Sequence, residues 1–145
     1  AIGTSALAAG AVTTVKLATS LTLTTPIIGA ATGTSLVATG TVVSHIAINP
    51  QVASYTLALT DDGKVTEISS ASSTTLTVPP NSSVDFPIGT QIVILQTSTG
   101  QITLTQGAGV TINATPGLKL RTTWSSATLI KRATDTWVAI GDLAA

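Results

Sequence analysis

The sequence predicts an all-β protein in which an antiparallel β-sandwich or jelly-roll-like domain (residues 51–145) follows an extended N-terminal arm (residues 1–50). Three observations favour this class. From Tyr55 onward, strand-like segments recur about every eight to twelve residues, between turns rich in Gly, Pro, Asp and Asn. No stretch keeps a helical period. Residues 1–50 are rich in Ala, Thr, Gly and Ser, with Leu and Val at no constant spacing.

Charge is scarce in this chain. Six basic and six acidic residues cancel, and 8% of residues are charged, against roughly 25% in an average domain. Because phosphate contacts supply most nucleic-acid affinity, this composition excludes an electrostatic nucleic-acid binder. Residues 17–60 carry no charged side chain. Thr, Ser, Gly, Asn and Pro interrupt them throughout, so no apolar window of about 18 residues exists and we expect no membrane insertion. The initial Ala suggests a complete cytosolic product whose Met has been removed.

The arm is expected to depend on neighbouring subunits. Ordering about 50 residues costs roughly 50 to 100 kcal/mol of backbone entropy, which the small side chains of this segment cannot offset. The arm should therefore bury its larger apolar residues against other chains. The candidate interface residues are Val12, Val15, Leu17, Leu21, Leu23, Ile27, Ile28 and Leu36 in the arm, with Arg132 in the domain.

The first strands of the domain are predicted at residues 55–60 and 64–69. They flank Asp61-Asp62-Gly63, and Asp-Gly is a strong hairpin signal because both residues tolerate positive φ. A further strand, residues 74–79, ends at Pro79-Pro80.

Residues 86–96, FPIGTQIVILQ, form the most apolar stretch and predict the central strand of the sandwich. Phe86 and Ile88 should anchor the turn around Pro87 and Gly89. The run from Ile92 to Leu95 is apolar on both faces, which is typical of a strand covered on both sides. Ser98-Thr99-Gly100 then turns the chain into strand 101–106, and Gly107 and Gly109 permit another reversal into 110–113.

Three strands are predicted to complete the domain: residues 118–124, 127–133 and 137–143, the last two joined by a turn containing Asp135. Because adjacent residues on a strand point to opposite faces, either Lys131 or Arg132 must look inward or across an interface, with Asp135 or Asp142 as a partner. The expected core residues are Phe86, Ile92, Ile94, Leu129 and Trp137.

No group of residues has the pattern of a catalytic, cofactor or metal site, and we expect no enzymatic activity. His45 is the single histidine and lacks a triad or a ligand cluster. Asp61 and Asp62 are adjacent carboxylates at a turn, which favours a structural role over a calcium site or a glycosidase pair. Tyr55, Trp124 and Trp137 could line a sugar-binding platform, but core or subunit packing is favoured.

Four phrases of the domain resemble a module that recurs in tailed-phage structural proteins, notably tail fibres and small virion-surface proteins. They are YTLALTDDGKVTEISSAS, LTVPPNSSVDFPIGTQIVILQ, GQITLTQGAGVTIN and SATLIKRATDTWVAIGDL. The arm phrases AAGAVTTVKLA and LTTPIIGAATGTSL are similar to the linkers that precede such modules.

This resemblance implies a β-rich, non-enzymatic virion component, commonly trimeric. We expect a homotrimeric capsid decoration (cement) protein, made in the host cytoplasm, that binds the phage major capsid protein on the virion surface. The alternative is a short tail fibre or receptor-binding subunit that contacts tail proteins and a host surface glycan through loops near residues 80–87 and 113–117. A third possibility is a free carbohydrate-binding module.

Overall fold

The structure is a computed structural model that describes residues 45–145. These residues belong to one compact unit. The arm residues named above as interface candidates, from Val12 to Leu36, lie outside the described residues. The first strand begins at Ile48, so strand pairing starts within the last residues of the predicted arm.

The described part contains eleven strands and one short 3-10 helix. In chain order they are β1 (Ile48–Gln51), β2 (Tyr55–Thr56), η1 (Leu59–Asp61), β3 (Val65–Ile68), β4 (Thr74–Val78), β5 (Gln91–Gln96), β6 (Ile102–Gln106), β7 (Thr111–Ala114), β8 (Lys119–Leu120), β9 (Ser126–Ala133), β10 (Thr136–Gly141) and β11 (Leu143–Ala144). They form a six-stranded sheet in the order β1-β3-β5-β9-β10-β7 and a five-stranded sheet in the order β11-β8-β6-β4-β2.

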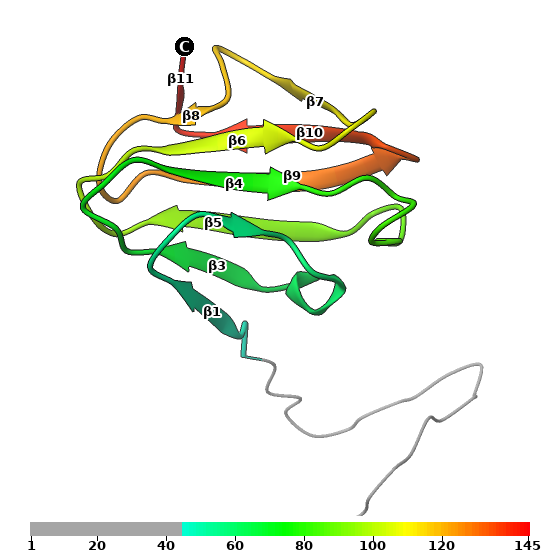
Figure 1. The fold of residues 1–145 in the computed structure, drawn as a ribbon, viewed down its shortest axis with the longest axis horizontal. Coiled ribbons are helices and arrows are strands. Elements are labelled where there is room, and N and C mark those ends of the chain that lie inside the picture. The colour runs from blue at the N-terminus through cyan, green and yellow to red at the C-terminus, as the bar shows by residue number, and fades with distance from the viewer. Residues whose placement is uncertain (1–44) are drawn as a thin grey trace, which may run out of the picture. The chain divides into compact units, whose positions relative to one another are not determined.

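From β1 to β6 the chain alternates between the two sheets (Figure 1). As a result β1, β3 and β5 pair in parallel in the six-stranded sheet, and β2, β4 and β6 pair in parallel in the five-stranded sheet. Each successive pair of strands therefore forms one coil stacked on the previous coil. This winding is that of a β-solenoid.

Backbone hydrogen bonds hold the corners of successive coils together. Gly100 N donates to Ser70 O at 2.9 Å, and Gly107 N donates to Val78 O at 2.9 Å. A Cβ atom at residue 100 would lie 2.1 Å from Ser72 O, so only glycine lets the two corners approach this closely.

The C-terminal strands close the six-stranded sheet differently. β9 pairs antiparallel with β5 and with β10, and β7 joins β10 in parallel. The β9–β10 hairpin turns at Asp135, whose φ is 53°. This hairpin was predicted from the sequence, and its turn residue tolerates the left-handed region.

The core lies between the two sheets and combines residues of both. All five residues that the sequence places there, Phe86, Ile92, Ile94, Leu129 and Trp137, are fully buried. The Phe86 and Trp137 rings meet edge to face, with their centroids 5.5 Å apart. This geometry matches the preferred arrangement of aromatic quadrupoles, and it fixes the segment leading into β5 against β10.

The all-β class and the two sheets agree with the prediction, but the antiparallel pairing is wrong for five of the nine strand ladders, which are parallel. The predicted hairpin around Asp61-Asp62-Gly63 is also wrong, because β2 and β3 lie in different sheets. Alternation and turn residues identify strands, but the sheet that each strand joins depends on long-range contacts.

Residues 86–96 differ from the prediction in two details. Ile88 does not anchor the turn, since it is 69% exposed at the tip of a turn closed by the hydrogen bond from Thr90 N to Pro87 O. In β5, Ile92 and Ile94 are buried, whereas Val93 and Leu95 are only half-buried. The second face of this central strand is therefore not covered within residues 45–145.

Candidate functional site

The polar side chains of the described domain serve mainly to hold the fold. Within residues 45–145, no three His, Cys, Asp or Glu side chains lie close enough together to hold a metal ion. His45 is exposed at the start of this region. Over the same residues, the structure contains no helix long and apolar enough to cross a membrane.

Asp61 is a buried carboxylate that links three elements. It is 1% exposed and accepts hydrogen bonds from Asn49 Nδ2 of β1 at 2.8 Å, from Tyr55 OH of β2 at 2.9 Å and from Ala58 N at 2.8 Å. Burial, and next the hydrogen bond to Asp61, raise the pKa of the Tyr55 phenol above its ordinary value of 10.0. The neighbouring Asp62 is exposed, so the two carboxylates do not act on one ligand.

Lys131 is the inward member of the Lys131–Arg132 pair. It is 3% exposed, and its Nζ donates to Phe86 O at 2.5 Å and to Asn81 Oδ1. The predicted partner Asp135 acts indirectly, because its Oδ1 accepts from the backbone N of Asn81 at 2.6 Å. Arg132, the candidate interface residue, is exposed on the outer side of β9.

Asp142 is held by two partners, Ser125 and Arg121. Its Oδ2 accepts from Ser125 Oγ at 2.6 Å, and its Oδ1 from Arg121 Nε at 2.5 Å. The hydrogen bond from Ser125, and then that from Arg121, lower the pKa of Asp142 below its ordinary value of 3.8. These contacts fix the loop between β8 and β9.

That loop presents Trp124, which is 72% exposed and has a φ of 69°. Its backbone N donates to Gln96 O at 2.7 Å, while Thr123 Oγ1 donates to Ser98 O at 3.0 Å. Positive φ is uncommon for a bulky residue and marks a position constrained by its surroundings. The backbone that carries the exposed indole is thus held at the end of β5.

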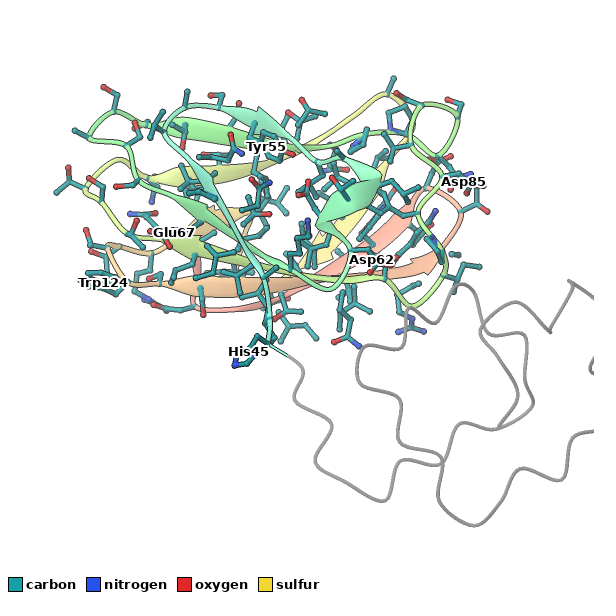
Figure 2. All side chains as sticks on the ribbon, turned by 90° about the horizontal axis from the view of Figure 1, so that it is seen from below. His45, Tyr55, Asp62, Glu67, Asp85 and Trp124 are labelled. Carbon is teal, nitrogen blue, oxygen red and sulfur yellow. The ribbon has the colours of Figure 1, made fainter. Side chains whose placement is uncertain are left out.

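The three aromatic residues considered for a sugar platform do not come together. Trp137 is buried in the core, and Tyr55 is bound to Asp61. Figure 2 shows Trp124 at one end of the described domain and Asp85 at the other, with Tyr55 between them. The interpretation of these three side chains as one sugar-binding platform is therefore wrong.

A further candidate site is the outer side of the six-stranded sheet, which we call the aliphatic face. The outward side chains alternate with the buried ones along each strand. On β1, β3, β5, β9 and β10 a series of half-buried or exposed residues, aliphatic except for Thr128, lies on this side: Ile48, Val65, Val93, Leu95, Thr128, Ile130, Val138 and Ile140. On the six strands of this sheet, only Glu67 and Arg132 are charged and point outward.

Strand register aligns these residues into a row across five strands. Ile48 pairs with Val65, Val65 with Val93, Val93 with Thr128 and Thr128 with Ile140. Ile48 and Ile140 end the row and are the most exposed of the face, at 60% and 59%. A shallow hollow beside Ile140 is lined by Asn113, Val138 and neighbouring residues of β7 and β10.

The outer side of the five-stranded sheet is chemically different, and we call it the threonine face. Thr56 pairs with Thr77 and Thr77 with Thr105 in one row, and Thr75 pairs with Thr103 in the next. Lys119 on β8 continues the second row. Each hydroxyl on this side can be solvated. The outer side of the five-stranded sheet is therefore polar, whereas that of the six-stranded sheet is largely aliphatic.

Among the described strands β1 is at the edge of the six-stranded sheet, and its outer edge is poorly suited to pairing with another strand. Val65 N of β3 donates to Ala47 O, and Ser69 N, just after β3, donates to Gln51 O. Alternate residues of β1 therefore face β3, and the backbone groups of Ile48 and Pro50 point to the outer edge. Pro50 has no N–H there, which is a common device against edge-to-edge association. The aliphatic face, not this edge, is the surface suited to binding.

Sequence reasoning did not identify the aliphatic face. The signal that could have found it is the contrast between IVIL at residues 92–95 and the TLT pattern at 75–77 and 103–105. Both patterns are strands, but only the second has a polar side facing water.

No protein-family model matches the chain, and comparisons with curated proteins and with solved structures also gave no match.

Proposed function

We propose that this chain is a non-enzymatic virion structural protein of a tailed phage, a homotrimeric capsid decoration (cement) protein that stabilises the head shell. The phage assignment rests on the resemblance of the four phrases in residues 55–143 to phage structural modules. The role in assembly is supported by the surface of the domain.

The observation that carries the role in assembly is the aliphatic face. Five of the six strands (β1, β3, β5, β9 and β10) present aliphatic side chains outward, and the six strands turn only two charged residues to that side. Exposed apolar surface of this extent is characteristic of a protein that binds other proteins. The buried polar groups Asp61 and Lys131 are fully occupied in holding the fold.

The proposed partners are further copies of the chain and the phage major capsid protein. A decoration protein needs a rigid domain, and the stacked coils and the Phe86–Trp137 contact supply one. It also needs little charge where it contacts a shell, in keeping with a chain in which 8% of residues are charged.

Adding the purified full chain to particles stripped of it tests this function. Cement activity predicts saturable binding at hundreds of copies per particle and a higher temperature of capsid disruption. Binding at a handful of copies indicates a tail protein instead. No binding, or binding without greater heat resistance, removes the cement function.

The alternative is a short tail fibre or receptor-binding subunit, and one observation favours it: Trp124 is exposed and held at positive φ. Exposed Trp residues often anchor a partner or stack on a sugar ring. A Trp124→Ala variant separates the two functions. If the variant no longer attaches to host cells but still binds capsids, the tail-fibre function is supported. If it retains both activities, Trp124 is not the anchor.

A further inference from the structure

We infer that the side chains of Lys131 and Asn81 react with each other and form an amide, an intramolecular cross-link between β9 and the turn that follows β4. The inference adds a covalent modification to the proposed function and does not depend on it. The reaction needs no cofactor and no second chain.

The two reacting groups are already in contact. Lys131 Nζ donates a hydrogen bond to Oδ1 of the Asn81 carboxamide, and 50 residues separate the two positions in the sequence. The amide carbon Cγ is bonded to this oxygen. Rotation about the last side-chain torsion of Asn81, which is soft in asparagine, therefore brings Cγ within reach of Nζ.

Lys131 is held at its backbone and at the end of its side chain. Its backbone N donates to Thr90 O at 3.0 Å, its backbone O accepts from Gly89 N at 2.9 Å, and its Nζ donates to Phe86 O at 2.5 Å. These contacts fix the lysine against the segment that leads into β5.

Asn81 is held by its own turn and by the β9–β10 hairpin. Ser83 N and Val84 N both donate to Pro80 O, at 2.9 Å and 3.0 Å, which closes the turn. Asn81 N donates to Asp135 Oδ1 at 2.6 Å. Because both reactants are fixed, the reaction between them is effectively unimolecular, which raises its rate over that of a free amine and a free amide.

The charge of Lys131 supplies a driving force. Its side chain is 3% exposed, and a lysine buried to this degree is normally paired with a carboxylate. Within residues 45–145 the one ion pair joins Arg121 and Asp142, and the acceptors of Lys131 Nζ are two neutral oxygens. Burial of a charge without an opposite charge is costly, and conversion of the ammonium group into a neutral amide removes that cost.

The step balances without a co-reactant. Nζ gives up a proton, and its lone pair then forms a bond to Cγ of Asn81 while the bond from Cγ to Nδ2 breaks. In total, two of the Nζ protons pass to Nδ2, so that one ammonium ion is released and the positive charge leaves with it. Asn81 is half-buried, which leaves this ion close to water.

The proton carrier is Asp135, whose carboxylate contacts the reacting residue at its backbone N. A carboxylate in this position accepts a proton from Nζ and delivers it to the leaving nitrogen, as in general acid–base catalysis. Asp135 lies at the β9–β10 turn with a φ of 53°, and this turn places its side chain beside Asn81.

The cross-link joins the two sheets, because β4 belongs to the five-stranded sheet and β9 to the six-stranded sheet. The loop that it closes contains β5 to β8. Such a bond limits the conformations of the unfolded chain, as a disulfide does, in a chain that contains no cysteine. The hydrogen bonds of Lys131 stabilise the fold before the amide forms, and the amide adds to them.

Mass spectrometry of the full chain tests the inference. After folding, the intact chain should be lighter than its sequence by one ammonia, and a protease digest should contain a branched peptide that joins residues 81 and 131. Lys131→Arg keeps a charged donor but its guanidinium does not form this amide, so the variant should have the mass of its sequence. The matched control Lys119→Arg, at an exposed lysine of β8, should lose ammonia as the wild type does.

Three results would overturn the inference. They are a folded wild type with the full mass of its sequence, a loss of ammonia without the branched peptide, and a loss of ammonia that persists in Lys131→Arg. The first would mean that Lys131 and Asn81 share a hydrogen bond only. The second and third would mean that an asparagine loses ammonia by a reaction in which Lys131 has no part.

Asp135→Asn tests the proton carrier. Asparagine keeps an acceptor for Asn81 N and tolerates positive φ, but it does not carry a proton as a carboxylate does. The variant should form the cross-link about a hundredfold more slowly, with unchanged near-ultraviolet dichroism, so that chains of full mass remain after folding. If Asp135→Asn forms the cross-link as fast as the wild type, Asp135 does not carry the protons.

Discussion

Lys131 Nζ donates to the main-chain carbonyl of Phe86 at 2.5 Å, inside a domain where the lysine is only 3% exposed. The same Nζ binds Asn81 Oδ1, whose residue is in turn held by Asp135 through its backbone N–H. A charge on β9 thus positions the segment that leads into the central strand β5. The next residue, Arg132, points to the opposite side of the strand and is exposed.

Because Lys131 is buried and Arg132 is exposed, we expect substitutions at these adjacent positions to have unequal effects on the free energy of unfolding. Lys131→Met keeps the side-chain length but leaves Asn81 Oδ1 and Phe86 O without their donor. It should lower the free energy of unfolding by about 2 kcal/mol, because buried acceptors lose a charged partner. Arg132→Met should change it by less than about 0.5 kcal/mol, since the side chain is exposed. Urea unfolding of both variants measures the difference, and equal midpoints contradict the role of Lys131.

Tyr55 predicts a loss of stability at alkaline pH. Burial, followed by the hydrogen bond to Asp61, raises the pKa of this phenol above 10.0, so the folded state holds the proton more tightly than the unfolded state does. The stabilisation is therefore complete below pH 10 and is lost as the pH rises from 10 through the pKa of the folded state.

Tyr55→Phe removes this titration and provides the control. The variant should be less stable than the wild type at pH 7 by about 1 kcal/mol, because one hydrogen bond to a buried carboxylate is lost. The difference between the two proteins should shrink above pH 10. Tyr55 is the only tyrosine, so tyrosinate absorbance reports its ionisation directly. A midpoint at or below 10.0 in the folded protein would refute the prediction.

The predictable part of the fold was local. The limits of β3, β4, β6, β7 and β9 to within about a residue, the β9–β10 hairpin and the core position of Ile92, Ile94 and Trp137 follow from alternation and turn residues. The predicted strand 118–124 is wrong in extent, because β8 covers only Lys119–Leu120. These features depend on residues close together in sequence, where φ preferences and the two-residue period of a strand are decisive.

The pairing of the strands was not predictable by the same means. Asp-Gly at residues 62–63 is typical of a hairpin turn. In the structure, however, Asp61 is buried and accepts hydrogen bonds from Asn49 and Tyr55, and the chain crosses to the other sheet. Such contacts join residues distant from the turn. The aliphatic face was missed for a related reason: the apolar residues Val93 and Leu95 were assigned to a second covered side.

Asp142 predicts a loss of stability in acid. The hydrogen bond from Ser125, and then that from Arg121, lower its pKa below 3.8. The associated stabilisation is present above pH 3.8 and is lost as the pH falls through the lower pKa of the folded state. Ser125→Ala should raise the pKa of Asp142 towards 3.8 and more so than Arg121→Gln does, because Ser125 makes the larger contribution. Carboxyl chemical shifts followed by NMR measure both values, and the reverse order would disprove this ranking.

The exposure and the positive φ of Trp124 predict that its side chain can be removed with little change in stability. Its side chain is 72% exposed and its φ is 69°, a value that glycine adopts at no steric cost. Trp124→Gly should therefore change the free energy of unfolding by less than about 1 kcal/mol, since relief of the strained φ offsets the greater entropy of glycine in the unfolded chain. Thermal unfolding measures this. A much larger loss would show that the indole packs against the domain and is not available to a partner.

The adjacent residues Val93 and Ile94 give the sharpest test of which side of the central strand is the core. Ile94 is fully buried between the sheets, whereas Val93 is half-buried on the aliphatic face, where it pairs with Val65 and Thr128. Ile94→Asp places an unpaired carboxylate in the core and should abolish folding, seen as loss of the protected fluorescence of Trp137. Val93→Asp places the same charge on the outer side, where water can reach it, and should leave the fold intact while preventing assembly of the copies. If Val93→Asp unfolds the domain as Ile94→Asp does, the face is part of the core; if Ile94→Asp gives a folded protein, the core has been placed on the wrong side of β5.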